Sequence, residues 1–362
     1  MKVAVISLGS KSSLMVANAL KKYFDIVDSI DIRDIEVSLS GERPEVLYAG
    51  KLLGKYNCIY AKGSFRYEPL LRSITAALYK DCYMPIKATA FTVGHDKLLT
   101  QLDMQQHKIP MPITYISSTT EAAKKILKKV NYPIIMKFPS GTGGKGVMYA
   151  ESFAAASSML DALTALRQPF IIQEYVETSG VDIRAIVVGD RVVAAMKRKA
   201  EIGEKRANIH AGGAGEACTL DTYTKKIAVD AAKAIGADIC GVDMLESVKG
   251  PLVIEVNVSP GLQGITAATK IDVADKIAGY LYEKTREFTE SGKKIGAKEI
   301  LNEIETKPKE IITSLDFRGN RILLPELITK ITGFSDKEEF SIKGDKDGLI
   351  IKRFGVGEKK KR

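Results

Sequence analysis

Short apolar runs alternate with amphipathic stretches over the first ninety residues of the chain. The runs predict buried strands at Lys2–Ser7, Ile26–Ile30 and Asn57–Ala61. The amphipathic stretches predict one helix that ends near Tyr23 and another over Tyr67–Tyr79. Because strands that alternate with helices build parallel sheets, we expect an α/β domain here.

The polar loop after the third of these strands has two interpretations. It contains Lys62, Gly63, Ser64 and Arg66. Open α/β sheets bind ligands beyond the carboxyl ends of their strands, so these residues could face an acidic substrate. They could equally form an ordinary solvated loop, and the sequence leaves both possibilities open.

The pattern further along predicts a longer series of elements. Helices are predicted over Thr92–Gln106, Glu121–Val130, Asp221–Ile235 and Ile271–Glu287. Single strands are predicted over Tyr132–Lys137, Val147–Ala150 and Pro169–Val176. Two hairpins are predicted, one joining Asp182–Val188 to Arg191–Lys197 and one joining Ile239–Leu245 to Leu252–Val258. The fold class is therefore mixed α/β.

The second hairpin contains polar residues where a core strand would have apolar ones. Side chains alternate between faces along a strand, so Glu255 and Asn257 share one face, and Asp243 can lie opposite them. Two carboxylates and an amide oxygen are ligands suited to Mg²⁺. The alternative is a strand whose acids face water, and it explains less well why two polar residues share one face inside an apolar run.

A lysine and a glycine-rich loop predict a phosphate site. Lys137 lies in an apolar strand, and a lysine is almost never buried without a partner. The loop that follows contains Gly141, Gly143, Gly144 and Lys145. Backbone N–H groups of such a loop can enclose phosphates. It is not a Walker A loop, because Lys145 is followed by Gly146. A flexible hairpin is the alternative.

These motifs carry a family resemblance. The segment GVDML, followed by PLVIEVNVSPGL, resembles the metal-binding end of the ATP-grasp fold. The stretch from Phe91 to Tyr282 resembles RimK-like carboxylate–amine ligases, which add glutamate. The resemblance implies a pre-ATP-grasp domain at residues 1–91, a central lid subdomain at 92–170 and a C-terminal ATP-grasp subdomain at 171–287.

The resemblance also implies roles for individual residues. Mg²⁺ or Mn²⁺, expected as two ions, would be held by Asp243, Glu255 and Asn257. Contacts to ATP would come from the glycine-rich loop and from Lys97, Lys137, Gln173, Glu174, Tyr175, Val176, Asp182 and Lys197. Among these, Lys97 would contact the phosphates, the segment Glu174–Val176 would form the hinge that holds adenine, and Asp182 would bind the ribose hydroxyls. Arg206 and Asn208 would act on the transferring phosphate, and Arg198, Ser259 and Gly261 would contact the substrate.

The chain beyond the last predicted helix departs from ordinary RimK-like ligases. Residues 288–310 read as a linker and 357–362 as a basic tail. Residues 311–356 resemble an AbrB-like swapped-hairpin module, which implies a homo-oligomer. DNA binding is a weaker interpretation, because acidic residues nearly balance basic ones in the module.

Composition limits the protein class and its partners. The net charge of +10 admits an anionic partner, for which a nucleotide and an acidic substrate suffice. The absence of a long apolar run, of a signal peptide and of CxxC pairs indicates a cytoplasmic protein without membrane contact. The expected function is ATP-dependent ligation of an amino acid, predicted to be glutamate, to a carboxylate at a protein C-terminus or on a coenzyme. The alternatives are a non-catalytic nucleotide sensor and a DNA-binding regulator.

Overall fold

The computed structural model describes two compact units, Met1–Gly296 and Ala297–Arg362. The described residues are 1–139, 146–199, 215–304 (backbone alone for 292–304), 316–319, 321–326, 328, 332–335, 338–345 and 348–354. No helix within these ranges is both long enough and apolar enough to cross a membrane.

The first unit begins with the predicted parallel sheet. Its strand order is β2-β1-β6, from Ile26–Asp31, Lys2–Ser7 and Cys58–Ala61. Helix α1 (Lys11–Leu20) follows β1, and the Ser10 hydroxyl caps it by accepting from the N–H of Ser13. A small antiparallel sheet that we did not predict follows β2, made of β3 (Ile35–Ser38), β4 (Glu45–Tyr48) and β5 (Lys51–Leu52).

Three helices follow strand β6 of the parallel sheet: α2 (Glu68–Leu78), α3 (Ala88–His95) and α4 (Lys97–Gln106). The prediction of one continuous helix over Thr92–Gln106 is wrong. Asp96 has the extended φ and ψ of −114° and 114°, and its carboxylate accepts from the N–H groups of Leu98 and Leu99. An aspartate that caps a helix in this way ends the preceding one, so Lys97 is the first residue of α4.

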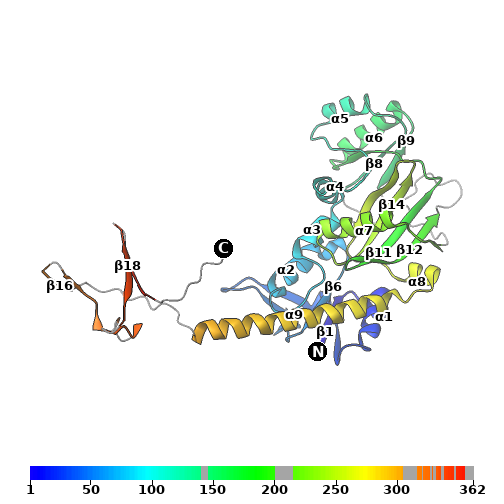
Figure 1. Cartoon of the computed structure of the whole chain (residues 1–362). Helices are drawn as coiled ribbons and strands as arrows, with labels where there is room; N and C mark the ends of the chain where they lie inside the picture. Colours follow the sequence, from blue (N-terminus) through cyan, green and yellow to red (C-terminus); the bar gives the residue numbers. More distant parts are fainter. Residues whose placement is uncertain are drawn as a thin grey trace. The chain divides into compact units, whose positions relative to one another are not determined.

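A second, four-stranded antiparallel sheet has its own core. The strand order is β7-β10-β8-β9, from Thr114–Tyr115, Ile171–Glu174, Ile134–Lys137 and Val147–Ala150. Helices α5 (Thr120–Leu127) and α6 (Phe153–Ala165) cover it, as Figure 1 shows. Because β10 lies between β7 and β8, this sheet extends beyond residue 170, where we placed the end of the central subdomain. The subdomain boundaries remain predictions.

The third, five-stranded antiparallel sheet contains both predicted hairpins. Its order is β13-β12-β11-β14-β15, from Gly215–Ala217, Arg191–Lys199, Val181–Val188, Ile239–Ser247 and Gly250–Asn257. Helix α7 (Thr222–Ile235) packs on this sheet. The Asp221 side chain caps its first turn, and Gly236, with a left-handed backbone conformation, ends it. Helices α8 (Gln263–Thr269) and α9 (Val273–Ile304) follow, and α9 continues past Glu287, where we expected it to end.

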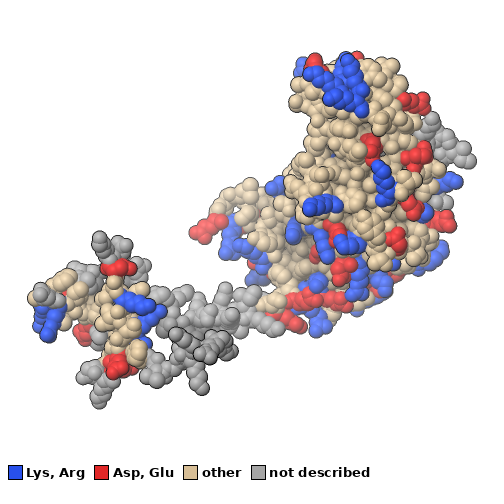
Figure 2. All heavy atoms as spheres, turned by 45° about the horizontal axis from the view of Figure 1, so that its top comes forward, with Lys and Arg blue, Asp and Glu red and all other residues tan. Residues whose placement is uncertain are grey.

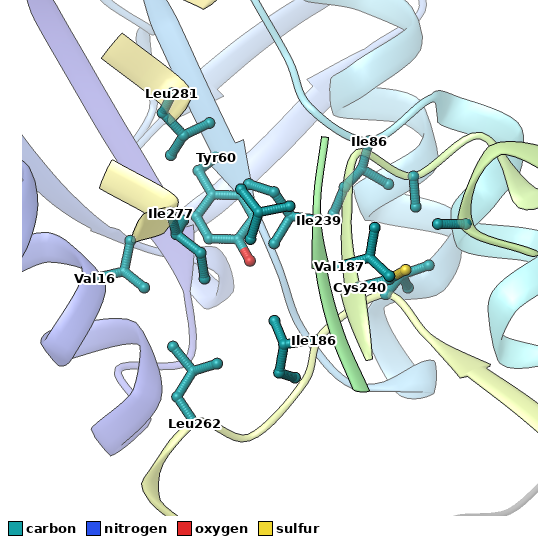
Figure 3. Close-up of a cluster of buried hydrophobic side chains, with 14 of the residues drawn as sticks. Val16, Tyr60, Ile86, Ile186, Val187, Ile239, Cys240, Leu262, Ile277 and Leu281 are labelled. Carbon is teal, nitrogen blue, oxygen red and sulfur yellow. The ribbon is translucent and has the colours of Figure 1, made fainter. Parts of the chain in front are cut away.

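One hydrophobic core joins the parallel sheet to the five-stranded sheet. Figure 3 shows Tyr60 of β6 packed among Ile277 and Leu281 of α9 and Ile239 of β14. Leu262, in the turn after β15, lies in the same cluster and is fully buried. The carboxyl end of β6 and the turn after β15 are therefore held by a common core.

The second unit, as far as it is described, consists of two strand pairs. β16 (Asp316–Arg318) pairs with β17 (Arg321–Leu323), and β18 (Phe340–Gly344) pairs with β19 (Leu349–Arg353). These short strands agree with the predicted β-rich module.

Candidate active site

The β14–β15 hairpin brings the predicted metal ligands together. Asp243 lies directly opposite Glu255, and Gly241 lies opposite Asn257. Directly opposed residues of an antiparallel pair project on the same side, so the shared face that the alternation predicted is present. Because Gly241 has no side chain, Pro260 can pack closely beside it: a Cβ at this position would lie 3.2 Å from Pro260 Cβ.

A buried network of four charges occupies the same face of the sheet. The Arg184 guanidinium donates to both carboxylate oxygens of Asp243, from Nε at 2.8 Å and from Nη2 at 2.7 Å. Arg198 Nη2 lies 3.0 Å from Asp243 Oδ2, and Arg198 also binds Asp182 through two hydrogen bonds. Burial raises the pKa of Asp243, but the two arginines outweigh it and hold this pKa below its usual value. Asp243 is therefore ionised at neutral pH.

Glu255 is placed differently from Asp243. No described basic group lies within 4.0 Å of its carboxylate. Burial, and then the negative charge of Asp243, raise its pKa above the usual value. Two facing acids in a largely buried position are stabilised when a cation lies beside them. The oxygens of Glu255 and Asn257, with a shared oxygen of Asp243, fit a hard divalent cation such as Mg²⁺.

A chain of hydrogen bonds fixes Lys137 inside the four-stranded sheet. Lys137 is 4% exposed, and its Nζ donates to Gln173 Oε1 at 2.9 Å. Gln173 Nε2 donates in turn to the Thr114 hydroxyl at 2.8 Å. Burial, and then the charge of Lys97, lower the pKa of Lys137 to about 8. A phosphate would reverse this shift, since an anion favours the charged lysine.

The predicted adenine hinge follows β10. The N–H of Glu174 donates to the carbonyl of Ile113 at 2.9 Å, which ties the end of the strand to the segment before β7. The ring of Tyr175 packs edge-on against that of Tyr149, with 5.1 Å between centroids. Glu174, Tyr175 and Val176 are all half-buried.

A cavity of about 420 Å³ opens beside the β14–β15 hairpin. Its lining includes Glu255, Asn257, Ser259 and Gly261, together with Lys97 from the start of α4. Further lining comes from the parallel-sheet region, through the end of β1, the first turn of α1 and the loop after β6. Two of the three predicted metal ligands, one predicted phosphate ligand and two predicted substrate contacts therefore line one cavity, and Asp243 lies behind them, opposite Glu255 in the hairpin.

Comparison with known proteins decides the family. Residues 94–281 match the model of the RimK-like ATP-grasp domain. The chain belongs to the RimK-like ATP-grasp family. Relatives named "Probable alpha-L-glutamate ligase" include one from Vibrio cholerae, 35% identical over 289 residues, which are 78% of this chain and 95% of the relative. Another, from Shewanella loihica, is 37% identical over 266 residues, which are 72% and 87% of the two chains.

Solved structures support the same fold. The ATP-grasp ligase PsnB, complexed with minimal precursor, Mg and ADP, superposes with a TM-score of 0.62 at 17% identity and covers 79% of this chain and 98% of its own. A RimK domain protein from Sphaerobacter thermophilus gives a TM-score of 0.60 at 17% identity, with 77% and 99% covered. The predicted ATP-grasp fold, with its N-terminal parallel sheet, is confirmed.

Some predicted site residues of this RimK-like protein are not brought to the cavity. Lys197 lies next to Arg198 on β12 and therefore projects to the other side of the sheet, where its Nζ pairs with Glu246 at 3.0 Å. Arg198 and Asp182 bind each other, and neither lines the cavity. The described residues Lys137, Gln173, Glu174, Tyr175 and Val176 also lie outside the lining of this cavity. Six further predictions lie outside the described residues, namely Gly141, Gly143, Gly144, Lys145, Arg206 and Asn208.

The sequence analysis missed one member of the RimK-like site. Arg184 is 7% exposed and supplies the strongest contacts to Asp243. Its signal was present in the sequence: an arginine stands in the apolar strand 181–188, two residues after Asp182 and on the same face. A buried arginine requires an acidic partner, and this requirement could have pointed to Asp243.

Proposed function

We propose that this chain is an ATP-dependent carboxylate–amine ligase. An oxygen of a substrate carboxylate attacks the γ-phosphorus of ATP, and ADP leaves as an acyl phosphate forms. The nitrogen of an amino group then attacks the acyl carbon, and inorganic phosphate leaves with the electron pair of the broken C–O bond. The amine loses a proton, and the product is an amide.

One observation carries this proposal: Glu255, which faces the buried Asp243 across the β14–β15 hairpin, lines a cavity together with Asn257 and Lys97. Phosphoryl transfer depends chiefly on positioning and on neutralising the phosphate oxygens. Mg²⁺ at Asp243, Glu255 and Asn257 would supply part of that neutralisation, and two ions are expected there. Lys97 and Lys137 would contribute their own positive charges on the neighbouring side.

Other contributions remain proposals without a described position. Arg206 and Asn208 would stabilise the charge that develops on the transferring oxygens. The loop with Lys145 would close over the phosphates. Asp182, proposed as the ribose ligand, would have to share its oxygens between the ribose hydroxyls and Arg198.

We propose L-glutamate as the incoming amine. Relatives that match this chain over nearly their whole length are named alpha-L-glutamate ligases. The acceptor would be a carboxylate at a protein C-terminus or on a coenzyme. Several structural neighbours are complexed with precursor peptides, which favours a peptide-like acceptor.

The test is ADP release from Mg-ATP in the presence of each amino acid and of fractionated lysate as the source of acceptor. ADP release that requires both glutamate and one fraction is the expected result. Release that is indifferent to amino acids would contradict the choice of amine. Nucleotide binding without any ADP release would favour the non-catalytic sensor instead.

The second unit is proposed to hold the chain in a homo-oligomer as an AbrB-like module. Apolar side chains on its strands are exposed, including Phe317, Ile322, Ile342 and Ile350. Sedimentation equilibrium of the full chain and of its Ile342→Lys variant tests this, and a monomeric unmodified chain would contradict it. A cytoplasmic location, consistent with four unpaired cysteines, remains a prediction.

A further inference from the structure

Lys62 is a buried lysine that the proposed reaction does not yet use. It follows β6 and is 4% exposed, and it lines the 420 Å³ cavity together with Glu255 and Asn257. No described acidic group lies within ion-pairing distance of it, and burial lowers the pKa of its ammonium group to about 8.

The ammonium group of Lys62 makes one hydrogen bond, which is too weak to explain its burial, and it lies 5.7 Å from the centroid of the Tyr60 ring. Its Nζ donates to the carbonyl of Pro260 at 3.4 Å, near the upper limit for a hydrogen bond. Moving an ammonium group out of water costs several kcal/mol unless an anion and further hydrogen bonds compensate. A lysine with a purely structural role would have an acidic partner here.

The surroundings of Lys62 favour an anion. The first turn of α1 lines the same cavity and contains no acidic residue, so the positive end of this ten-residue helix lies at the cavity that Lys62 also lines. Ser12 fixes that turn, since its hydroxyl accepts from the N–H of Leu262 at 2.9 Å and donates to Gln263 at 2.7 Å. Glu255 is the one acidic residue among the described residues of the lining.

The position of Lys62 is rigid. Tyr60, two residues before it, and Leu262, two residues after Pro260, are both packed in the core of Figure 3. In addition, the N–H of Gly63 donates to the Ser259 hydroxyl at 3.0 Å. The lysine is therefore held against the turn after β15, on the side of the cavity that belongs to the parallel sheet.

We infer that Lys62 and the first turn of α1 form a binding site for a carboxylate of one of the two substrates. This inference rests on the proposed ligase function and adds a recognition site to the same cavity. The carboxylate can belong to the incoming amino acid or to the acceptor, and one set of binding measurements distinguishes these sources.

The experiment uses the full chain saturated with Mg-ADP and measures binding by calorimetry. One probe is L-glutamate, which represents the incoming amino acid. The other is N-acetyl-L-glutamate, whose blocked amine makes it a mimic of an acceptor chain end. Each is titrated into the unmodified protein and into the Lys62→Met, Lys62→Arg and Arg66→Met variants. Arg66 is the matched control, because it lies in the same loop but is exposed and outside the cavity lining.

We expect Lys62→Met to weaken the binding of one probe by about ten- to a hundredfold, the range of a charged hydrogen bond. Lys62→Arg should retain most of the affinity, and Arg66→Met should bind normally. Selective loss of glutamate binding assigns the carboxylate to the amino acid, and selective loss of N-acetylglutamate binding assigns it to the acceptor. Equal affinities in all four proteins, or no binding of either probe to the unmodified protein, would overturn the inference.

Two controls separate this inference from the proposed function and from folding. Binding of Mg-ADP is measured first, and its absence in the unmodified protein would refute the proposed function instead. The Lys62→Met variant should keep its nucleotide affinity and should not melt at a lower temperature, because it replaces a buried charge with an apolar chain. A lower melting temperature with unchanged affinity for both probes would identify Lys62 as a structural residue and overturn the inference.

Discussion

Replacing Arg184 with Met should destabilise the protein far more than the loss of a surface ion pair would. Arg184 and Asp243 are 7% and 4% exposed and are joined by two hydrogen bonds of 2.8 and 2.7 Å. Removal of one partner from a buried pair costs about 3–5 kcal/mol, because the other charge is left without compensation. Arg198 still lies 3.0 Å from Asp243, so we expect a cost near the lower limit, about 3 kcal/mol.

Lys197→Met is the matched control for this measurement. Like Arg184 of β11, Lys197 of β12 forms an ion pair with an acid of β14. Its partner is Glu246 at 3.0 Å, but the two side chains are 44% and 65% exposed. An exposed pair of this kind contributes about 1 kcal/mol or less. Urea unfolding followed by circular dichroism gives both free energies of unfolding, provided that the slope with denaturant is unchanged.

Two results would refute the reasoning about Arg184. The first is an equal loss of stability in the two variants, which would mean that burial adds nothing to the Arg184–Asp243 pair. The second comes from the double variant Arg184→Met/Asp243→Leu, in which the uncompensated carboxylate is gone while Asp182 and Arg198 still pair. We expect it to recover at least half of the loss, and no recovery would show that the cost has another source.

Three further predictions concern single positions. Glu255→Ala should abolish ADP release without lowering the melting temperature, because the side chain serves the metal site and not the core; unchanged turnover would remove it from that site. Burial lowers the pKa of Lys62 to about 8 from 10.5, so the unfolded chain binds more protons between these values and stability should rise with pH there. Lys62→Met should lack this part of the rise in urea unfolding between pH 8 and 10, and an identical pH profile would contradict the assignment. Gly94→Ala should destabilise the chain by about 1–3 kcal/mol, since the added Cβ would lie 2.7 Å from a methyl group of Val258; a variant as stable as the parent in urea would show that Val258 moves aside freely.

The metal-binding hairpin could be predicted because its information is local. Alternation within Leu252–Val258 places Glu255 and Asn257 on one face, and the short turn places Asp243 opposite. The pairing of Arg184 with Asp243 is different, because it depends on the register between β11 and β14, which lie more than fifty residues apart. Local alternation cannot fix that register, so the pairing of the ionised Asp243 with Arg184 could be found only from the structure.

The helix break at Asp96 shows a second limit of local patterns. The apolar periodicity continues through Thr92–Gln106, and aspartate is compatible with both a helix interior and a helix cap. The choice between them depends on the N–H of Lys97, which donates to the carbonyl of Pro139 at 3.0 Å. That contact with a distant strand end orients α4, and no residue near Asp96 signals it.

The two buried lysines of the described residues illustrate why one was recognised from the sequence and the other was not. Lys137 lies inside an apolar strand, so local sequence alone indicates that its ammonium group is buried and needs a partner. Lys62 follows a strand end and precedes glycine and serine, a context that fits a solvated loop equally well. It is buried because the turn at Pro260, nearly two hundred residues later, packs over the end of β6. Gln173 accepts a hydrogen bond of 2.9 Å from the ammonium group of Lys137, whereas that of Lys62 donates to one carbonyl at 3.4 Å and lies 5.7 Å from the Tyr60 ring centroid. The lysine with the less conspicuous sequence context therefore has the greater need of a bound anion.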